Sequence, residues 1–548
     1  MSDPGLCGEC FHAQTIRSER GPIYYLCRLA LTDARFDKYP RLPVRECEGH
    51  RLAGESAWRK RLPHKGAGRK PGGRPEGLTP RATIEGIGAD VNPAYLEDAS
   101  GFRGHAERVI VPGEESGVVA ALREASAAGV AVTIAGAGTG LTGGRVPLGG
   151  WVISLEKFRR LEVRPGHAIA GAGVLLRDLH AAAQGSGQFY PPDPTETGAS
   201  MGGTIATNAS GSRSFKYGAT RRWIEGLRVV LADGRTMDVA RGEAFDLNCG
   251  DFECGAIPLP AVTKNTAGYL FRPGMDWIDL FAGSEGTLGV VIEARVRLLP
   301  APGAVLAGVI FFPDDDAALD AVEGWRGAPA RMLEYFDGPS LALLRRRFPE
   351  IPGQARAAIL FEQELASEDD AELDAWSARI DDSGALANDS WVALSAADRE
   401  RFRLFRHALP ELVNDTVRRG GVLKMGTDYA VPLARNREML AYYRCRLERE
   451  FPGRYVIFGH IGDAHLHVNV FSSPENPRAA TELILEFARK AVELGGTVSA
   501  EHGLGRRKAH LLKLQYAPEH LEAMRAVKRR LDPQNILGRG VLWEGDAR

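Results

Sequence analysis

A glycine-rich segment at residues 135–144, AGAGTGLTGG, constrains the fold more than any other part of the chain. Gly138, Gly140 and Gly143 match the G-x-G-x-x-G spacing of dinucleotide-binding loops. In a Rossmann fold such a loop opens a helix, whose N-terminus holds the pyrophosphate. Here the residues that follow, RVPLGG with Pro147, lead directly into a predicted strand, so no crossover helix fits. The loop instead predicts a pyrophosphate cradle made of successive backbone N–H groups between strands.

The rest of the chain predicts an α+β fold. Apolar residues predict short strands at 109–112, 131–136, 151–155, 305–312 and 357–363. A helical pattern ends at Gly129, and Asp233-Gly234 predict the turn of a hairpin. Residues 455–471 predict a strand, a turn and a second strand.

The length of 548 residues exceeds what one hydrophobic core serves, so several domains are expected. We expect a cysteine-bearing module at 1–50, a basic Pro/Gly-rich linker at 51–88, and larger domains at 89–300 and 301–548. A net charge of −1 argues against a protein that binds nucleic acid over its whole surface. No long apolar run and no secretory signal occurs, so we expect a cytoplasmic protein without a membrane span.

Four of the seven cysteines lie in the first 47 residues, namely Cys7, Cys10, Cys27 and Cys47. Cys7-x-x-Cys10 places two thiolates on one turn, and the other two would complete a tetrahedral sulfur site for zinc or for a 4Fe–4S cluster. The alternative is four unrelated thiols. The basic linker is either solvated or a contact for nucleic acid or a partner protein, whereas an iron–sulfur cluster in the module would relay electrons.

Four ordered motifs give the chain its likeness to a known family. They are GAGTGLTGG at 136–144, PPDPTETGASMGGTIATNASGSRSFKYG at 191–218, GLRVVLADG at 226–234 and GSEGTLGVV at 283–291. Together they resemble the FAD-binding domain of the vanillyl-alcohol oxidase type, in the branch of the D-lactate, glycolate and D-2-hydroxyglutarate dehydrogenases. The resemblance runs from about residue 90 to residue 543. It implies a two-subdomain FAD-binding domain followed by an α+β substrate domain, or cap.

The same motifs supply the residues that we expect to bind FAD. Glycines allow backbone N–H groups to reach the pyrophosphate, Thr139 adds a hydroxyl, and small residues form flat surfaces for a ring system. The resemblance implies that several others line the flavin. The full expected set is Gly136, Gly138, Thr139, Gly140, Leu141, Pro192, Asp193, Gly202, Gly203, Asn208, Gly211, Tyr217 and Gly218. These loops contain no histidine or cysteine for a covalent link, so we expect dissociable FAD.

Two glycine-bounded motifs near the C-terminus concentrate histidines and one glutamate. Residues 459–467 read GHIGDAHLH, and residues 495–507 read GGTVSAEHGLGRR. On a strand His465 and His467 share one face, because side chains alternate. His460 lies before a Gly-Asp turn and folds back toward them. Two histidines and a carboxylate with an open position are a usual catalytic metal set, such as zinc or manganese would occupy.

The family resemblance implies roles for these residues. His460, His467 and Glu501 would hold the divalent metal, and His502 would accept the proton of the substrate hydroxyl. The family's usual Gly-Asn is Ala464-His465 here. His465 would therefore join the metal ligands, replace one of them, or simply pack.

A 2-hydroxy acid also needs a cation for its carboxylate. Arg406 matches the position of the family's substrate arginine, with Arg403 as the nearby competitor. A lysine of some family members is replaced by Gly426, and Lys424 is the candidate substitute. This departure argues against a dicarboxylate substrate.

The sequence thus predicts an FAD-dependent dehydrogenase that oxidises a small D-2-hydroxy acid, such as D-lactate or glycolate. The resemblance implies an acceptor protein or a quinone as the destination of the electrons. An oxidase with the same fold that acts on another alcohol or a lactone is the alternative. The oligomeric state stays open, a homodimer included.

Overall fold

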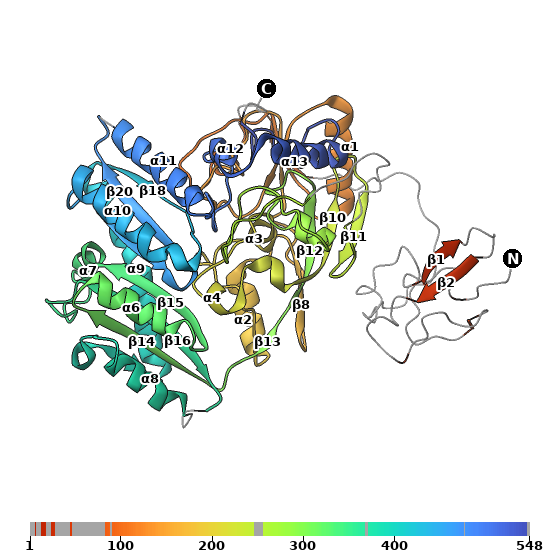
Figure 1. Cartoon of the computed structure of the whole chain (residues 1–548). Helices are drawn as coiled ribbons and strands as arrows, with labels where there is room; N and C mark the ends of the chain where they lie inside the picture. Colours follow the sequence, from red (N-terminus) through yellow and green to blue (C-terminus); the bar gives the residue numbers. More distant parts are fainter. Residues whose placement is uncertain are drawn as a thin grey trace. The chain divides into compact units, whose positions relative to one another are not determined.

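A computed structural model describes residues 6, 13–17, 23–27, 35, 44–45, 83–87, 90–245, 256–367, 371–475 and 477–544 (Figure 1). The chain divides into two compact units. One comprises residues 1–77 with 238–240, and the other comprises residues 78–237 with 241–548. In the first unit β1 (Ala13–Arg17) pairs antiparallel with β2 (Ile23–Cys27). Cys7, Cys10 and Cys47 lie outside the described residues, so the four-cysteine site remains a prediction.

The glycine-rich loop follows the edge strand β5 of a four-stranded sheet with the order β3-β4-β6-β5. Its strands are β3 (Thr83–Ile87), β4 (Arg108–Val111), β5 (Val132–Ala135) and β6 (Trp151–Ser154). Helix α1 (Glu115–Ala128) connects β4 to β5, which both run parallel to β6. No helix forms between β5 and β6, as predicted from Pro147. Strand β3 lies within the segment predicted as a linker.

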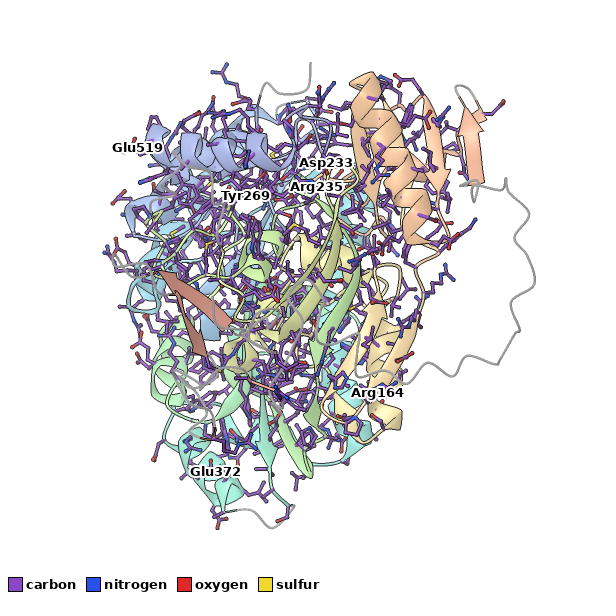
Figure 2. All side chains as sticks on the ribbon, turned by 90° about the vertical axis from the view of Figure 1, so that its right-hand side faces the viewer. Arg164, Asp233, Arg235, Tyr269, Glu372 and Glu519 are labelled. Atoms are coloured by element: carbon purple, nitrogen blue, oxygen red, sulfur yellow. The ribbon has the colours of Figure 1, made fainter. Side chains whose placement is uncertain are left out.

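A five-stranded sheet with the order β11-β10-β12-β8-β7 forms the second part of the domain predicted at residues 89–300. Its strands are β7 (Leu161–Arg164), β8 (His167–Gly171), β10 (Ile224–Val230), β11 (Thr236–Ala240) and β12 (Val290–Arg297). The helices here are α2 (Leu176–Gly185), α3 (Met201–Ala206), α4 (Ser214–Tyr217) and α5 (Trp277–Phe281). The predicted hairpin turn is confirmed, because β10 and β11 are neighbours and the backbone N–H of Leu231 donates to the carbonyl oxygen of Arg235 at 2.8 Å (Asp233 and Arg235 are labelled in Figure 2).

The remaining domain contains a seven-stranded antiparallel sheet with the order β17-β14-β16-β15-β19-β20-β18. The strands are β14 (Ala304–Phe312), β15 (Ala330–Asp337), β16 (Ala357–Leu365), β17 (Trp391–Ala393), β18 (Leu423–Gly426), β19 (Tyr455–His460) and β20 (His465–Ser472). Its helices are α6 (Asp315–Trp325), α7 (Gly338–Leu344), α8 (Glu372–Asp381), α9 (Ala396–Gly420), α10 (Asn436–Glu450) and α11 (Arg478–Glu493). Two short strands, β9 (Gln188–Phe189) and β13 (Leu299–Pro300), pair antiparallel, and β13 ends just before β14 begins.

Alternation along β16 explains how helices cover both faces of this sheet. Leu360 is buried in a cluster with Phe402 and Phe405 of α9. Its neighbour Phe361 points to the other face and stacks on Trp376 of α8, with ring centroids 4.0 Å apart. The predicted mixed α+β architecture is therefore confirmed. None of the helices in the described ranges is long and apolar enough to cross a membrane.

The C-terminal segment returns to the first sheet through α12 (Leu512–Gln515) and α13 (Pro518–Leu531). Lys528 of α13 is buried and donates to the carbonyl oxygens of Thr287 and Leu537, each at 2.9 Å. It also pairs with Asp532, which is itself fully buried and accepts from the backbone N–H of Ile536 and Leu537. This ion pair fixes the C-terminal chain against the edge of β5.

Lys528→Met is expected to destabilise the protein by about 3–5 kcal/mol, because it leaves the carboxylate of Asp532 buried without its cation. Urea denaturation followed by tryptophan fluorescence measures the change. The matched control is Lys513→Met, which removes an ion pair with Glu544 whose side chains are both 62% exposed. That control should change the free energy of unfolding by less than about 1 kcal/mol. Equal effects of the two substitutions would contradict this account of the C-terminal segment.

Candidate functional site

A cavity of about 310 Å³ lies where the glycine-rich loop, the start of α3 and the segment before β12 meet. Seven of the predicted FAD-binding residues line it: Gly136, Gly138, Thr139, Gly140, Leu141, Gly202 and Gly203. Two of these glycines are required by the backbone. Gly138 has a φ of +79°, and a Cβ at Gly202 would lie 2.8 Å from the Cβ of Ala172. The loop therefore approaches the cavity through its main chain.

The structure places the other six predicted FAD residues outside this lining, which still leaves their role a prediction. Asp193 pairs with Arg213 at 3.2 Å, and Tyr217 bonds to Glu364. Asn208 accepts from the backbone N–H of Arg221 at 2.9 Å. The remaining three are Pro192, Gly211 and Gly218, of which Gly211 packs too closely against the Asp193 carbonyl to admit a Cβ. These residues support the segments that form the wall.

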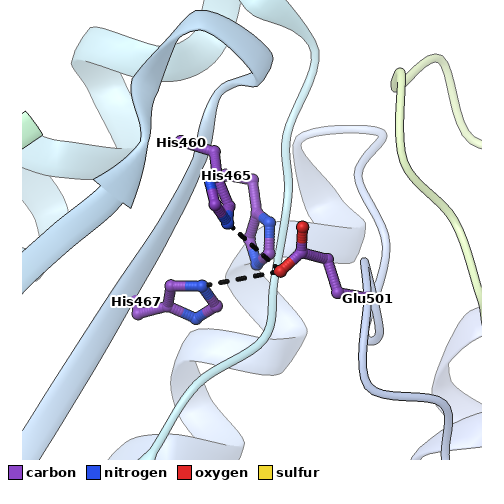
Figure 3. A group of neighbouring side chains, drawn as sticks. All are labelled: His460, His465, His467 and Glu501. Carbon is purple, nitrogen blue, oxygen red and sulfur yellow. Dashed lines mark hydrogen bonds and ion pairs between the residues drawn. The ribbon is translucent and has the colours of Figure 1, made fainter. Parts of the chain in front are cut away.

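Three histidines and a glutamate meet at the β19–β20 hairpin (Figure 3). His460 Nε2 lies 3.2 Å from Glu501 Oε2, and His467 Nε2 lies 3.8 Å from the same oxygen. One ligand atom from each of these residues and from His465 lies within 4.8 Å of the others. The three residues that the resemblance assigned to a metal are thus neighbours.

Glu501 presents one oxygen to the histidines because the other is already bound. Its Oε1 accepts from Lys264 Nζ at 2.7 Å and from Ser210 Oγ at 2.8 Å. Lys264 is 1% exposed and also lies 3.3 Å from Asp463. Lys264 was not predicted as a site residue, because the segment VTKNTAG carries no local sign that a lysine there is buried beside two distant carboxylates.

Glu334 was also missed, although it fixes the orientation of His460. Its Oε1 lies 2.5 Å from His460 Nδ1, and its Oε2 accepts from Arg406 Nε at 2.7 Å. Such a carboxylate sets which ring nitrogen of a metal-binding histidine is available. Burial alone would lower the pKa of His460, but Glu334 and Glu501 raise it above the ordinary value.

Arg406, the predicted cation for the substrate carboxylate, therefore already has partners within the protein. Its Nη1 donates to Thr195 Oγ1 at 2.8 Å, and Thr195 lines the cavity. Arg403, the competitor, pairs with Glu400 on the exposed face of α9. Of the two arginines, Arg406 is the one whose guanidinium reaches both the cavity wall and the histidine cluster.

His502 and Glu501 are positioned together by Asp428. The carboxylate of Asp428 accepts from the backbone N–H of Glu501 at 3.1 Å and of His502 at 3.0 Å. Its Oδ1 also lies 3.6 Å from His502 Nδ1. Both Glu501 and His502 line the cavity. The cavity and the histidine cluster therefore share this pair of adjacent residues.

The donor set fits a divalent metal. Burial, together with the neighbouring imidazoles of His465 and His460, holds the pKa of His467 well below its ordinary value, so this ring is neutral and able to ligate. Donors on a tetrahedral zinc lie about 3.4 Å apart, given Zn–N bonds of about 2.0–2.1 Å. The distances of 3.2 and 3.8 Å around Glu501 Oε2 bracket that separation.

Comparisons with known proteins place the chain beside FAD-linked oxidoreductases. A model of the FAD binding domain matches residues 106–240, and a model of the C-terminal domain of FAD linked oxidases matches residues 301–542. A D-lactate dehydrogenase of Archaeoglobus fulgidus is 33% identical, over 79% of this chain and 90% of its own length. A glycolate oxidase subunit of Bacillus subtilis is 30% identical, over 83% and 93%. A D-2-hydroxyglutarate dehydrogenase of Xanthomonas citri pv. viticola is 31% identical, over 80% and 89%.

A solved structure shows the same fold. The chain aligns with an alkyldihydroxyacetonephosphate synthase with a TM-score of 0.59 over 80% of this chain and 76% of that one. The two sequences are 15% identical in this alignment, so the likeness concerns the fold.

Glu285 connects the cavity to the Glu501–His502 segment. Its two carboxylate oxygens accept from the backbone N–H of Leu504 and Gly505, each at 2.8 Å, and it lines the cavity. Burial raises the pKa of Glu285 to about 7, although the two N–H groups act in the opposite direction. The contribution of Glu285 to the free energy of unfolding is therefore fully present below about pH 4.5 and is lost as the pH rises through about 7.

Glu285→Gln is expected to remove this pH dependence. Between pH 5 and pH 8 the free energy of unfolding of the unsubstituted protein should fall relative to that of the variant by about 2–3 kcal/mol. The lower figure allows for the contact of Glu285 with solvent in the cavity. Urea denaturation of both proteins at the two pH values measures the difference, and any constant cost of the substitution cancels. Parallel pH profiles would contradict a raised pKa at Glu285.

Proposed function

The chain belongs to the family of FAD-linked oxidases, and we propose that it oxidises a small D-2-hydroxy acid to the 2-oxo acid, with FAD as its cofactor. The adjacent residues Glu501 and His502 carry the proposal, because they line the cavity while Glu501 also faces His460 and His467. A substrate beside this pair would contact the cavity and the histidine cluster at once. The relatives named for D-lactate, glycolate and D-2-hydroxyglutarate support the substrate class.

Two bound groups belong to the proposal. FAD in the cavity supplies the acceptor for the hydride that leaves C2 of the substrate. A zinc or manganese ion held by His460, His467 and Glu501 supplies a Lewis acid for the hydroxyl and carboxylate oxygens. We expect FAD to be held without a covalent bond, since the described lining contains no cysteine and its one histidine, His502, has another role.

The chain's own residues handle the proton and the carboxylate. His502 accepts the hydroxyl proton of the substrate, and Asp428 beside its Nδ1 orients the ring and stabilises the charge that the proton brings. Arg406, held by Glu334 and Thr195, attracts the carboxylate. His460 and Lys264 hold the pKa of Glu501 well below its ordinary value against the effect of burial, and Lys264 fixes the orientation of its carboxylate. These roles explain why so many buried charges meet here.

Further parts of the proposal concern the N-terminal module and the partners. Spacing supports zinc or an iron–sulfur cluster at Cys7, Cys10, Cys27 and Cys47. Metal analysis with an absorption spectrum distinguishes the two, because only the cluster adds visible bands.

We propose an acceptor protein or a quinone as the electron acceptor. We also propose a cytoplasmic location, and a homodimer as the assembly, which light scattering tests.

The function is tested by an anaerobic absorption spectrum of the purified protein before and after addition of D-lactate, glycolate and D-2-hydroxyglutarate in turn. Bleaching of the flavin bands by one of these acids supports the proposal and narrows the substrate. Flavin that stays oxidised with all three acids, but is reduced by another alcohol or by a lactone, would overturn the substrate class. Absence of flavin from the folded protein would overturn the proposal that FAD is the cofactor.

His502→Asn should slow anaerobic flavin reduction by about 10²–10⁴-fold, because the hydroxyl proton loses its acceptor. FAD content should stay unchanged. Stopped-flow absorbance with the acid found above measures the rate. His510→Asn is the matched control, since His510 is exposed and close in sequence, and its rate should equal that of the unsubstituted protein. Flavin reduction at full rate in His502→Asn would assign the base to another residue.

A further inference from the structure

His465 occupies a position that the proposed metal set does not use. It is 0% exposed, and neither of its ring nitrogens has a hydrogen-bond partner among the described residues. Its Nε2 lies 3.3 Å from Asp428 Oδ1, but outside hydrogen-bond geometry. A buried imidazole that makes no hydrogen bond is costly even beside a carboxylate, and a bound ion is one explanation for such a group in a native protein. The ring of His465 therefore requires an explanation.

The hairpin directs this ring at the other two histidines. His465 lies directly opposite His460 in the register of β19 and β20, so the two side chains emerge on the same face. His467 lies two residues further along β20 and shares that face. The ring centroids are 5.3 Å apart for His460 and His465, and 4.4 Å apart for His465 and His467 (Figure 3). The three imidazoles thus surround one point.

The carboxylate leaves a place for a third imidazole. Lys264 and Ser210 bind Glu501 Oε1, so Glu501 offers only Oε2 toward the cluster. With His460 and His467 this makes three protein donor atoms, and a transition metal with five or six positions has room for a third imidazole while it keeps a position for the substrate oxygens. One ligand atom of His465 lies within 4.8 Å of the other three donors. No other histidine, cysteine, aspartate or glutamate of the described residues joins this group of four.

We propose that His465 is a fourth protein ligand, so that the metal site of this chain is made of three histidines and one monodentate glutamate. This inference rests on the metal site of the proposed function and adds a residue to it. Three imidazole nitrogens favour zinc and other imidazole-binding transition metals over magnesium or calcium, which prefer oxygen ligands. The extra ligand also holds the ion more tightly than two histidines and a glutamate would.

The test compares the metal affinity of the full-length, FAD-loaded protein with that of His465→Asn. Asparagine is the residue that the resembled family usually has here, so the variant is expected to fold and to retain FAD. Metal is removed with a chelator, and Zn²⁺ is titrated back in competition with a chromophoric chelator. His465→Asn should raise the Kd for Zn²⁺ by at least about tenfold, since even outer-shell partners of a metal change affinity by about 10–100-fold. The N-terminal cysteines are identical in both proteins and contribute equally.

Co²⁺ supplies a second readout that does not depend on affinity. Its visible absorption, at wavelengths longer than the flavin bands, reports the number and geometry of its ligands, so it should differ between the two proteins at saturation. His180→Asn is the matched control, because His180 is a half-buried histidine outside the cluster whose Nε2 also lacks a hydrogen-bond partner among the described residues. This control should leave both the Kd and the Co²⁺ spectrum unchanged.

The outcomes separate this inference from the proposed function. Equal Zn²⁺ affinity and equal Co²⁺ spectra in the unsubstituted protein and His465→Asn would overturn the role of His465, while the set of His460, His467 and Glu501 would stand. If neither protein binds metal, and the flavin is still reduced by a D-2-hydroxy acid, the metal site is wrong and this inference falls with it. Weaker Zn²⁺ binding and a changed Co²⁺ spectrum in His465→Asn, with neither change in His180→Asn, support the inference.

Discussion

The site depends on the hydrogen bonds and the ion pair that the buried carboxylate of Asp428 makes. It accepts hydrogen bonds from the backbone of Glu501 and His502 and from Ser499 Oγ, and it pairs with Lys508 at 2.7 Å. Burial alone would raise the pKa of Asp428, but His502 and Lys508 hold it well below the ordinary value, so the carboxylate stays charged. One ionised group thereby fixes the segment that carries both the proposed metal ligand and the proposed base.

A second network fixes the opposite side of the cluster. Lys264 holds Glu501 by one oxygen, and Glu334 holds His460 between itself and Glu501. Each of these charges would be costly to bury alone, and each is neutralised by a partner from a distant part of the sequence. Such networks orient side chains more than they stabilise the fold. These networks therefore position the side chains that would contact the substrate and the metal.

The sequence predicted the elements better than the connections between them. Strand and turn patterns located β5, the Asp233-Gly234 hairpin and the β19–β20 hairpin, because these depend on local periodicity and turn residues. The glycine loop and the histidine motifs were likewise found, since their residue types are compact in sequence. Lys264, Glu334 and Asp428 were missed, because nothing local distinguishes a buried charge whose partner lies far along the chain. Six of the thirteen expected FAD residues lie outside the cavity lining, a distinction that motif spacing does not make.

The most direct test of the central claim is a crystal structure of the FAD-loaded protein with Zn²⁺ and a 2-oxo acid product, with the metal located by anomalous scattering. We expect a zinc peak bound by His460, His467 and Glu501 Oε2, with the oxo acid beside it and its C2 oxygen within hydrogen-bond reach of His502. An oxo acid bound away from Glu501 and His502, with no metal among the imidazoles, would contradict the account.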